Sequence, residues 1–299
     1  MIKMEGVAAF VAVAEAGSIT EAARRLRLAK SVASERLAEL EKELGAPLIH
    51  RTTRRLSLTE DGAAFLERAR RILQEAAAAA GDLAERRGEL VGPMRIAAPV
   101  TFGRMHLSPA LMPFLAQHPA IELTLELDDR RVNAASDGFD AILRHGAIAD
   151  SRLIVWKLAT SVRHLVASTA YIDTHGAPDS LDSLSSHRGL FYSNRGVADW
   201  QFATQDGTRL VRATPALMAN NGDLLLDAAI AGLGIALLPT FIAGPAIRDG
   251  RLTIIDVGMV PEAEFIFMAH PEGRRASAKM RALAAHLKTT FGDPPYWEP

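Results

Sequence analysis

The sequence predicts an α/β protein in three parts: a small, mainly helical amino-terminal domain, one long helix, and a two-lobed α/β domain. Three observations support this prediction. A short helix, a turn and a longer helix follow one another within residues 20–44. A heptad stripe follows, and strands then alternate with helices in the remainder of the 299-residue chain. The expected parts are residues 1–58, 59–90 and 91–299.

Composition and charge exclude several classes of protein. Apolar residues make up 48% of the chain and charged residues 23%, which is ordinary for a globular protein. The absence of cysteine excludes disulfides, thiolate metal sites and catalytic thiols. Residues 1–55 hold ten Lys and Arg against seven Asp and Glu, whereas the whole chain has a formal net charge of −1. This basic head suits contact with a polyanion, although a solvated protein surface can have the same composition.

Helical spacing of apolar residues predicts helices over residues 4–16, 20–26 and 30–44. Ser18 and Glu21 form a capping box ahead of the second helix.

One face of the third helix carries Leu37, Leu40 and Leu44, and its opposite face is polar. This polar face supplies the first candidates for DNA contact: Lys30, Ser31, Ser34, Glu35 and Arg36. For Glu35, a surface ion pair with Arg36 is the alternative.

Two short extended runs, residues 47–49 and 56–58, predict a two-stranded wing with a basic tip. Arginine and threonine there suit phosphate and minor-groove contact. The candidates are Arg51, Thr52, Thr53, Arg54 and Arg55.

Residues 59–87 predict one long helix with Thr59 as its cap. Its apolar stripe is spaced three and four residues apart and suits either a dimer partner or packing on its own chain. The stripe consists of Leu66, Ala69, Leu73, Ala76, Ala80 and Leu83. Gly62 is expected to be a tolerable weak point inside this helix.

The third part alternates strand, helix, strand, helix, strand, which predicts a parallel sheet. These elements are residues 94–99, 102–117, 121–127, 132–138 and 139–144. Strands near residues 153–158 and 164–168 lead into a second lobe, and the last strand and helix return to the first. The expected lobes are residues 91–163 with 268–299, and residues 164–267.

Ligands of two-lobed α/β domains bind in the cleft at the strand ends. The loop before Phe102 reaches a helix amino terminus, where free amides and Thr101 suit an anion. Arg144 suits a carboxylate, or else a structural ion pair with Asp140 or Glu126. The other candidates are Phe102, Tyr192, Ser193, Asn220 and Asn221, of which the asparagines can equally be turn residues.

Residues 8–73 resemble the DNA-binding half of LysR-type transcriptional regulators. The matching runs are Phe10 to Ser18, Ala22 to Leu26, Leu40 to Gly45 and Arg51 to Gly62. The resemblance implies that the polar face of the third helix enters the major groove and that the wing contacts DNA. The chain departs from the common family pattern at Ala29, Lys30 and Glu35, and Glu35 can accept a hydrogen bond from cytosine.

The third part resembles the periplasmic-binding-protein-like effector domain of the same family. The resemblance implies a regulator that binds double-stranded DNA and a small-molecule effector, as a homodimer or as a homotetramer made of two dimers. Because the sequence has no membrane span and fits a signal peptide poorly, we expect the protein in the cytoplasm. Arg144 and Thr101 favour an anionic effector.

Other classes of function fit the sequence less well. It contains no nucleophile elbow, phosphate loop or dinucleotide fingerprint, so we expect no enzyme, cofactor or metal. No apolar run is long enough to span a bilayer. The alternative is a solute-binding protein without DNA binding, which the basic wing argues against.

Overall fold

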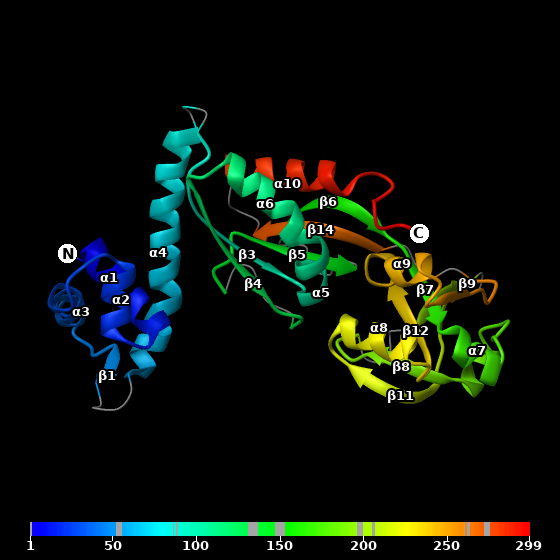
Figure 1. Cartoon of the computed structure of the whole chain (residues 1–299). Coiled ribbons are helices and arrows are strands. Elements are labelled where there is room, and N and C mark those ends of the chain that lie inside the picture. The colour runs from blue at the N-terminus through cyan, green and yellow to red at the C-terminus, as the bar shows by residue number, and fades with distance from the viewer. Residues whose placement is uncertain are drawn as a thin grey trace. The chain divides into compact units, whose positions relative to one another are not determined.

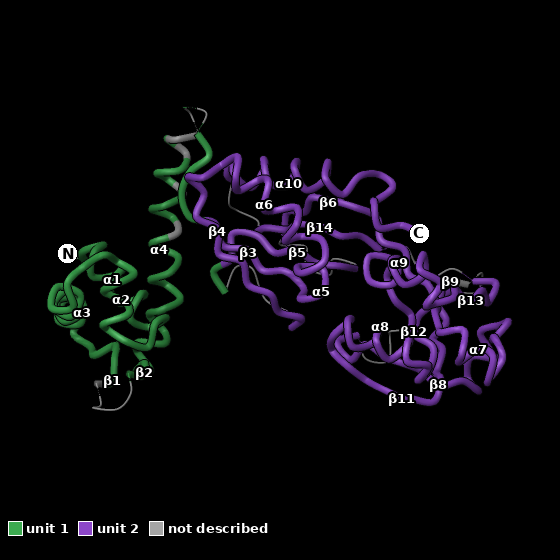
Figure 2. Tube along the Cα trace, viewed as in Figure 1, with its two compact units in different colours: residues 1–93, 135–138 green, residues 94–134, 139–299 purple. Residues whose placement is uncertain are grey.

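In the computed structural model, the chain forms two compact units (Figure 2). Unit 1 comprises Met1–Pro93 with Ala135–Gly138, and unit 2 comprises Met94–Ala134 with Phe139–Pro299. The residues that the structure describes are 2–51, 56–85, 87, 89–130, 137–146, 153–195, 200–204, 207–259, 261, 264–271 and 276–299. The expected helix over residues 132–138 lies mostly outside the described residues.

Unit 1 consists of helices packed around an apolar core, with a short antiparallel hairpin. Its elements are α1 (Met4–Ala16), α2 (Ile19–Arg25), α3 (Lys30–Leu44), β1 (Ile49–Arg51), β2 (Leu56–Leu58) and α4 (Glu60–Glu85). Phe10, Leu37 and Leu40 are fully buried in the core. Ser18 accepts a hydrogen bond from the Glu21 amide, but the Glu21 carboxylate binds Arg24 instead of closing the capping box.

The start of α4 is held by the Thr59 hydroxyl and by a close backbone approach to the segment before β1. Thr59 accepts a hydrogen bond from the Gly62 amide at 2.9 Å and donates one to the Pro47 carbonyl at 2.7 Å. A Cβ atom on Gly62 would lie 2.0 Å from the Leu48 carbonyl oxygen. Gly62 is therefore required for the close approach of the two segments, and the expectation of a mere weak point is wrong.

The heptad stripe of α4 divides into two parts. Ala69 is fully buried in the core of unit 1, and Leu66 and Leu73 pack against that core. In contrast, Ala76 and Ala80 are exposed, and Leu83 is 59% exposed. The first half of the stripe therefore stabilises its own domain, while the second half is open within the chain.

The first lobe of unit 2 is a five-stranded sheet in the order β4-β3-β5-β14-β6, with α6 and α10 along one side (Figure 1). Its strands are β3 (Gly92–Ala98), β4 (Ile121–Leu127), β5 (Ala141–Gly146), β6 (Leu153–Ser161) and β14 (Glu264–Pro271). Its helices are α5 (Val100–Phe102), the π-helical η1 (Gly103–Leu107), α6 (Ser108–Gln117) and α10 (Ala278–Phe291). β3 and β5 are parallel, as predicted, but β14 is antiparallel to both its neighbours.

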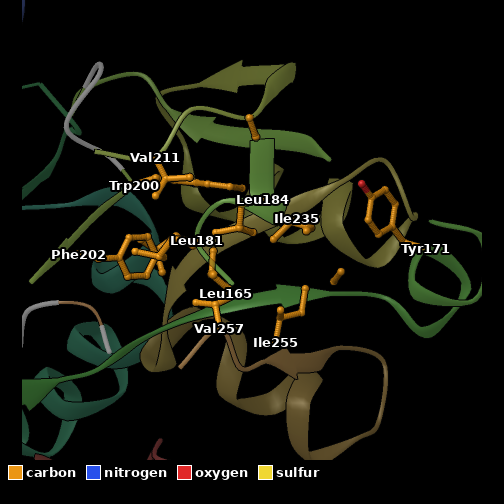
Figure 3. Packing of buried hydrophobic residues seen from close by; sticks show 13 residues of the cluster. Leu165, Tyr171, Leu181, Leu184, Trp200, Phe202, Val211, Ile235, Ile255 and Val257 are labelled. Atoms are coloured by element: carbon orange, nitrogen blue, oxygen red, sulfur yellow. The ribbon is translucent and has the colours of Figure 1, made fainter. Parts of the chain in front are cut away.

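The second lobe is a five-stranded sheet in the order β11-β8-β12-β7-β13. Its strands are β7 (Arg163–Ala167), β8 (Arg188–Tyr192), β11 (Thr214–Ala219), β12 (Ile235–Pro239) and β13 (Thr253–Ile255), beside the hairpin β9 (Gln201–Thr204) and β10 (Gly207–Leu210). Its helices are α7 (Thr169–His175), η2 (Ser183–Ser186), α8 (Gly222–Ile230) and α9 (Thr240–Arg248). Trp200, Phe202 and Leu184 are fully buried in its core (Figure 3).

Two strands cross between the lobes. The chain leaves the first sheet after Ser161 and enters the second at Arg163, close to the expected crossing. It is back in the first sheet at Glu264, four residues earlier than the expected boundary at 268. Glu264 is registered opposite Ser161, so the two crossings lie side by side and form the hinge of the two-lobed domain. The predicted fold class, a helix-turn-helix domain followed by a two-lobed α/β domain, is confirmed.

Candidate functional site

The polar face of α3 is the candidate DNA-binding surface in unit 1. Lys30, Ser31 and Glu35 are exposed, while Ser34 is half-buried. Arg36 forms an ion pair with Glu5 of α1 at 3.1 Å, so its charge is shared within the unit. Among the described residues, Glu35 makes no ion pair, which removes the alternative of a surface pair with Arg36.

The amino end of α3 has no side-chain cap. Ala29 occupies the N-cap position, and no side chain there accepts a hydrogen bond from the first turn. Helix amino termini leave backbone N–H groups without intrahelical partners. Those of α3 are therefore free to donate to an external acceptor, such as a phosphate oxygen.

The hairpin of unit 1 is supported from within the unit. The Glu41 carboxylate of α3 accepts hydrogen bonds from the amides of Leu48 and Ile49 at 2.9 and 3.1 Å. Arg51 ends β1, and the predicted tip residues Thr52, Thr53, Arg54 and Arg55 lie outside the described residues. Glu41 was not predicted as a support for the wing, because its partners follow it in the chain without a recognisable spacing.

The cleft of unit 2 contains a cavity of about 450 Å³, lined by residues of both lobes. Four of the predicted effector-site residues line it: Thr101, Phe102, Arg144 and Tyr192. Ser193, Asn220 and Asn221 are not among its described lining residues. Asn220 is exposed, and Asn221 caps α8 by accepting a hydrogen bond from the Leu224 amide.

Arg144 lines the cavity from within β5, close to the end of the strand rather than at it. It faces Phe267 in the register of β5 and β14, two residues before β5 ends at Gly146. Asp140 and Glu126, the predicted structural partners of Arg144, accept hydrogen bonds from the backbone and side chain of Arg95.

The amino terminus of α5 already holds an anionic side chain. The Val100 amide donates to Asp129 at 3.0 Å, and the Thr101 hydroxyl donates to Asp223 at 3.2 Å. Burial raises the pKa of Asp129, partly offset by the hydrogen bond from Val100. The sequence suggested free amides for an anion here, but a second anion would meet two carboxyl groups of the protein.

The hinge carries a buried charge cluster that the sequence did not reveal. Arg195 donates two hydrogen bonds to Glu264, from Nη1 to Oε1 at 2.5 Å and from Nη2 to Oε2 at 2.7 Å. Arg163 Nη2 lies 3.3 Å from Oε1 and His145 Nε2 lies 2.9 Å from Oε2. We call His145, Arg163 and Arg195 the basic cage; all three residues and Glu264 line the cavity.

Electrostatics hold Glu264 in its ionised form. Burial alone would raise the pKa of its carboxyl group, but hydrogen bonding by His145 and Arg195 and the nearby cationic charges lower it well below its usual range. Burial lowers the pKa of His145, so this imidazole is neutral at pH 7.

Further hydrogen bonds cross between the two lobes at the rim of the cleft. The Asn194 side chain donates to the Asp129 carbonyl at 2.7 Å, and Arg104 donates to Asp223 at 2.6 Å. Together with Arg195 and Glu264, these contacts hold the lobes in their present relation. The four residues of the hinge cluster stand at positions 145, 163, 195 and 264, so no local motif could have grouped them.

A helix-turn-helix unit and a two-lobed domain with a polar cavity define a ligand-responsive DNA-binding regulator. Residues 4–63 match the family described as bacterial regulatory helix-turn-helix protein, lysR family, and residues 87–292 match the LysR substrate binding domain. The chain belongs to the family of LysR-type transcriptional regulators, which combine a DNA-binding and an effector-binding domain.

Individual relatives agree with this assignment along the whole chain. The transcriptional regulator DmlR of Escherichia coli is 32% identical, over 95% of this chain and 93% of that regulator. CrgA of Neisseria meningitidis has a solved structure that is 31% identical, with a TM-score of 0.56 and coverage of 95% of both chains. The full-length structure of the Vibrio cholerae virulence activator AphB shares the fold, with a TM-score of 0.61 at 24% identity, over 95% of this chain and 98% of that one.

These similarities establish the class of function of the chain. The family consists of transcriptional regulators rather than enzymes. No helix in the described part of the chain is long and apolar enough to cross a membrane.

Proposed function

We propose that this regulator binds a dyad-symmetric DNA site through the polar face of α3 and the wing. The main support for this proposal is that α3 is buried on one face and exposes Lys30, Ser31 and Glu35 on the other. The uncapped amino end of α3 supports it, because backbone amides there suit phosphate. Ser34 and Arg36 flank this surface, and the residues at and around the wing tip, 51–55, extend it.

Dimerisation through the second half of α4 is part of this proposal. Leu83, Ala80 and Ala76 are exposed along one stripe, and small residues allow a second helix to approach closely. A two-fold pair places two recognition helices on one face of DNA, and two dimers form a tetramer. The protein acts in the cytoplasm, and no catalytic role is proposed.

The effector binds in the cavity of unit 2, in contact with Thr101, Phe102, Arg144 and Tyr192. The main support for this proposal is that these residues come from both lobes and line one cavity. A ligand there contacts the two lobes at once, so its affinity differs between lobe arrangements. That difference in affinity is what shifts the regulator between states.

The DNA-binding proposal is tested by the salt dependence of binding to DNA from upstream of the protein's own gene. Removing one phosphate contact reduces the slope of log affinity against log salt by about one. We expect this change for Lys30→Ala and for Arg54→Ala. Lys42→Ala, at the far end of α3, is the matched control. Unchanged slopes for the first two variants would remove these residues from the DNA interface.

The effector proposal is tested by a bulky substitution in the cavity wall. Thr101→Trp should leave DNA binding intact and abolish the change that a metabolite extract causes in DNA binding. A normal response would locate the effector site elsewhere.

The dimer proposal is tested by sedimentation. Leu83→Asp should shift the protein toward monomer, because it places a charge in the apolar interface. Arg71→Asp puts the same carboxylate on the opposite side of α4 and should leave the assembly unchanged.

A further inference from the structure

The ion pair of Arg195 with Glu264 joins the two lobes at the hinge. Arg195 follows β8 in the second lobe, and Glu264 begins β14 in the first. The two terminal nitrogens of Arg195, Nη1 and Nη2, each donate to one carboxylate oxygen of Glu264. This is the fork geometry by which guanidinium groups recognise carboxylates. The relative position of the two lobes therefore depends on whether Glu264 occupies the carboxylate site on Arg195.

The basic cage encloses this carboxylate almost completely. The side chain of Glu264 is 10% exposed and that of Arg163 is 4% exposed. His145 reaches the same carboxylate from β5 of the first lobe. The cage is thus a carboxylate-binding site that the protein fills with its own side chain, and it opens on the cavity.

The amino terminus of α5, the anion site that the sequence predicted, is closed. Asp129 occupies the amino terminus of α5, and the Thr101 hydroxyl is directed to Asp223. An incoming carboxylate would be repelled there by charges of its own sign. The basic cage offers cationic donors, provided that Glu264 yields its place.

Exchange of one carboxylate for another keeps the cage neutralised, but it leaves Glu264 without its partners. A buried carboxylate without a partner is strongly unfavourable, so a displaced Glu264 must reach water. Its carboxylate joins β14 of the first lobe to Arg195 of the second, so its withdrawal toward the cavity breaks this ion pair between the lobes. Displacement and lobe opening are therefore coupled.

We propose that Glu264 is a built-in ligand of the basic cage, and that the effector carries a carboxylate that replaces it on Arg195 and thereby releases the lobes. This inference rests on the proposed effector site in the cavity. The apolar wall formed by Leu225, Leu237 and Phe241 accommodates the hydrocarbon part of such a molecule.

The test measures binding of benzoate and acetate to the full-length protein by calorimetry and by the shift in melting temperature. Glu264→Gln removes the internal competitor and should tighten carboxylate binding at least about tenfold, the scale of charge-assisted hydrogen bonds. Glu264→Gln combined with Arg195→Gln should lose this gain. Glu126→Gln alters an ion pair within the first lobe and should bind as the unchanged protein does.

Equal binding of carboxylates by the unchanged protein and Glu264→Gln would overturn the proposal. So would a gain that survives the loss of Arg195, or an equal gain for inorganic phosphate. If Glu264→Gln fails to fold, Glu264→Asp serves instead, because it withdraws the carboxylate by one methylene. Glu264→Asp should bind benzoate and acetate more tightly than the unchanged protein, by a smaller factor than Glu264→Gln, without an equal gain for phosphate. Unchanged carboxylate affinity in this variant would again overturn the proposal.

These measurements need no DNA, so they separate this inference from the proposed function. Tighter carboxylate binding without specific DNA binding would support the inference and contradict the DNA-binding proposal. Specific DNA binding with unchanged carboxylate binding would do the reverse.

Discussion

The two candidate sites of this regulator differ in how their polar side chains are satisfied. On α3, Lys30 and Glu35 face solvent and make no ion pairs with described residues, so an external partner can take them directly. In the cleft, Arg195, Thr101 and Asp129 are already hydrogen-bonded to other protein groups. A ligand of the cleft must therefore compete with internal contacts, and this competition can move the lobes.

The strongest test of this difference removes the buried carboxylate. Glu264→Ala leaves the basic cage without its anion and should lower the free energy of unfolding by about 3–5 kcal/mol, as for other broken buried ion pairs. Glu39→Ala, which breaks the exposed ion pair with Lys3 near α3, should cause no measurable change. Urea unfolding of the full chain measures both, and similar effects would show that burial does not distinguish the sites.

A second test concerns the support of the DNA-binding surface. Gly62→Ala forces the start of α4 away from the Leu48 carbonyl, and should destabilise unit 1 by about 1–3 kcal/mol. Gly81→Ala lies in the same helix with open space around it and is the control. Hydrogen exchange of α1 and α3 reports the loss, and equal protection in both variants would contradict the close approach.

Acidification tests the electrostatics of the cleft. Burial holds the pKa of His145 below its ordinary value of about 6.5, so below that pH the unfolded chain takes up a proton that the folded protein does not. This contribution to stability is complete above about pH 6.5 and is lost as the pH falls. The carboxyl of Glu264, with its lowered pKa, adds a loss only below its ordinary value of about 4.5.

We therefore expect the melting temperature of unit 2 to fall between pH 7.5 and pH 5.5, and to fall less in His145→Gln. His106 also has a pKa lowered by burial, so part of the fall should persist in that variant. An identical fall in both proteins would mean that His145 takes up its proton in the folded protein as readily as in the unfolded chain, which would contradict the lowered pKa.

The smallest expected effect is at the start of α3. Ala29→Ser supplies the missing side-chain cap and should stabilise unit 1 by about 1 kcal/mol. Thermal unfolding measures the gain. Ala38→Ser, at an exposed position inside α3, should give none, and an equal gain would show that capping is not its cause.

Features that depend on neighbours along the chain could be predicted from the residues alone. Helical periodicity located α3 and its polar face, Thr59 was identified as the cap of α4, and alternation of strands and helices gave the fold class. Within the cleft the sequence identified Thr101 and Arg144 as cavity residues, because both stand near strand ends.

Contacts between groups that are far apart in the chain emerged only from the folded structure. It brought Glu264 to Arg195 across the hinge, filled the amino terminus of α5 with Asp129, and pressed Gly62 against Leu48. Pairs of this kind depend on the three-dimensional course of the chain, and their strength depends on burial, which lowers the dielectric constant around them. Neither quantity is encoded in the spacing of residues.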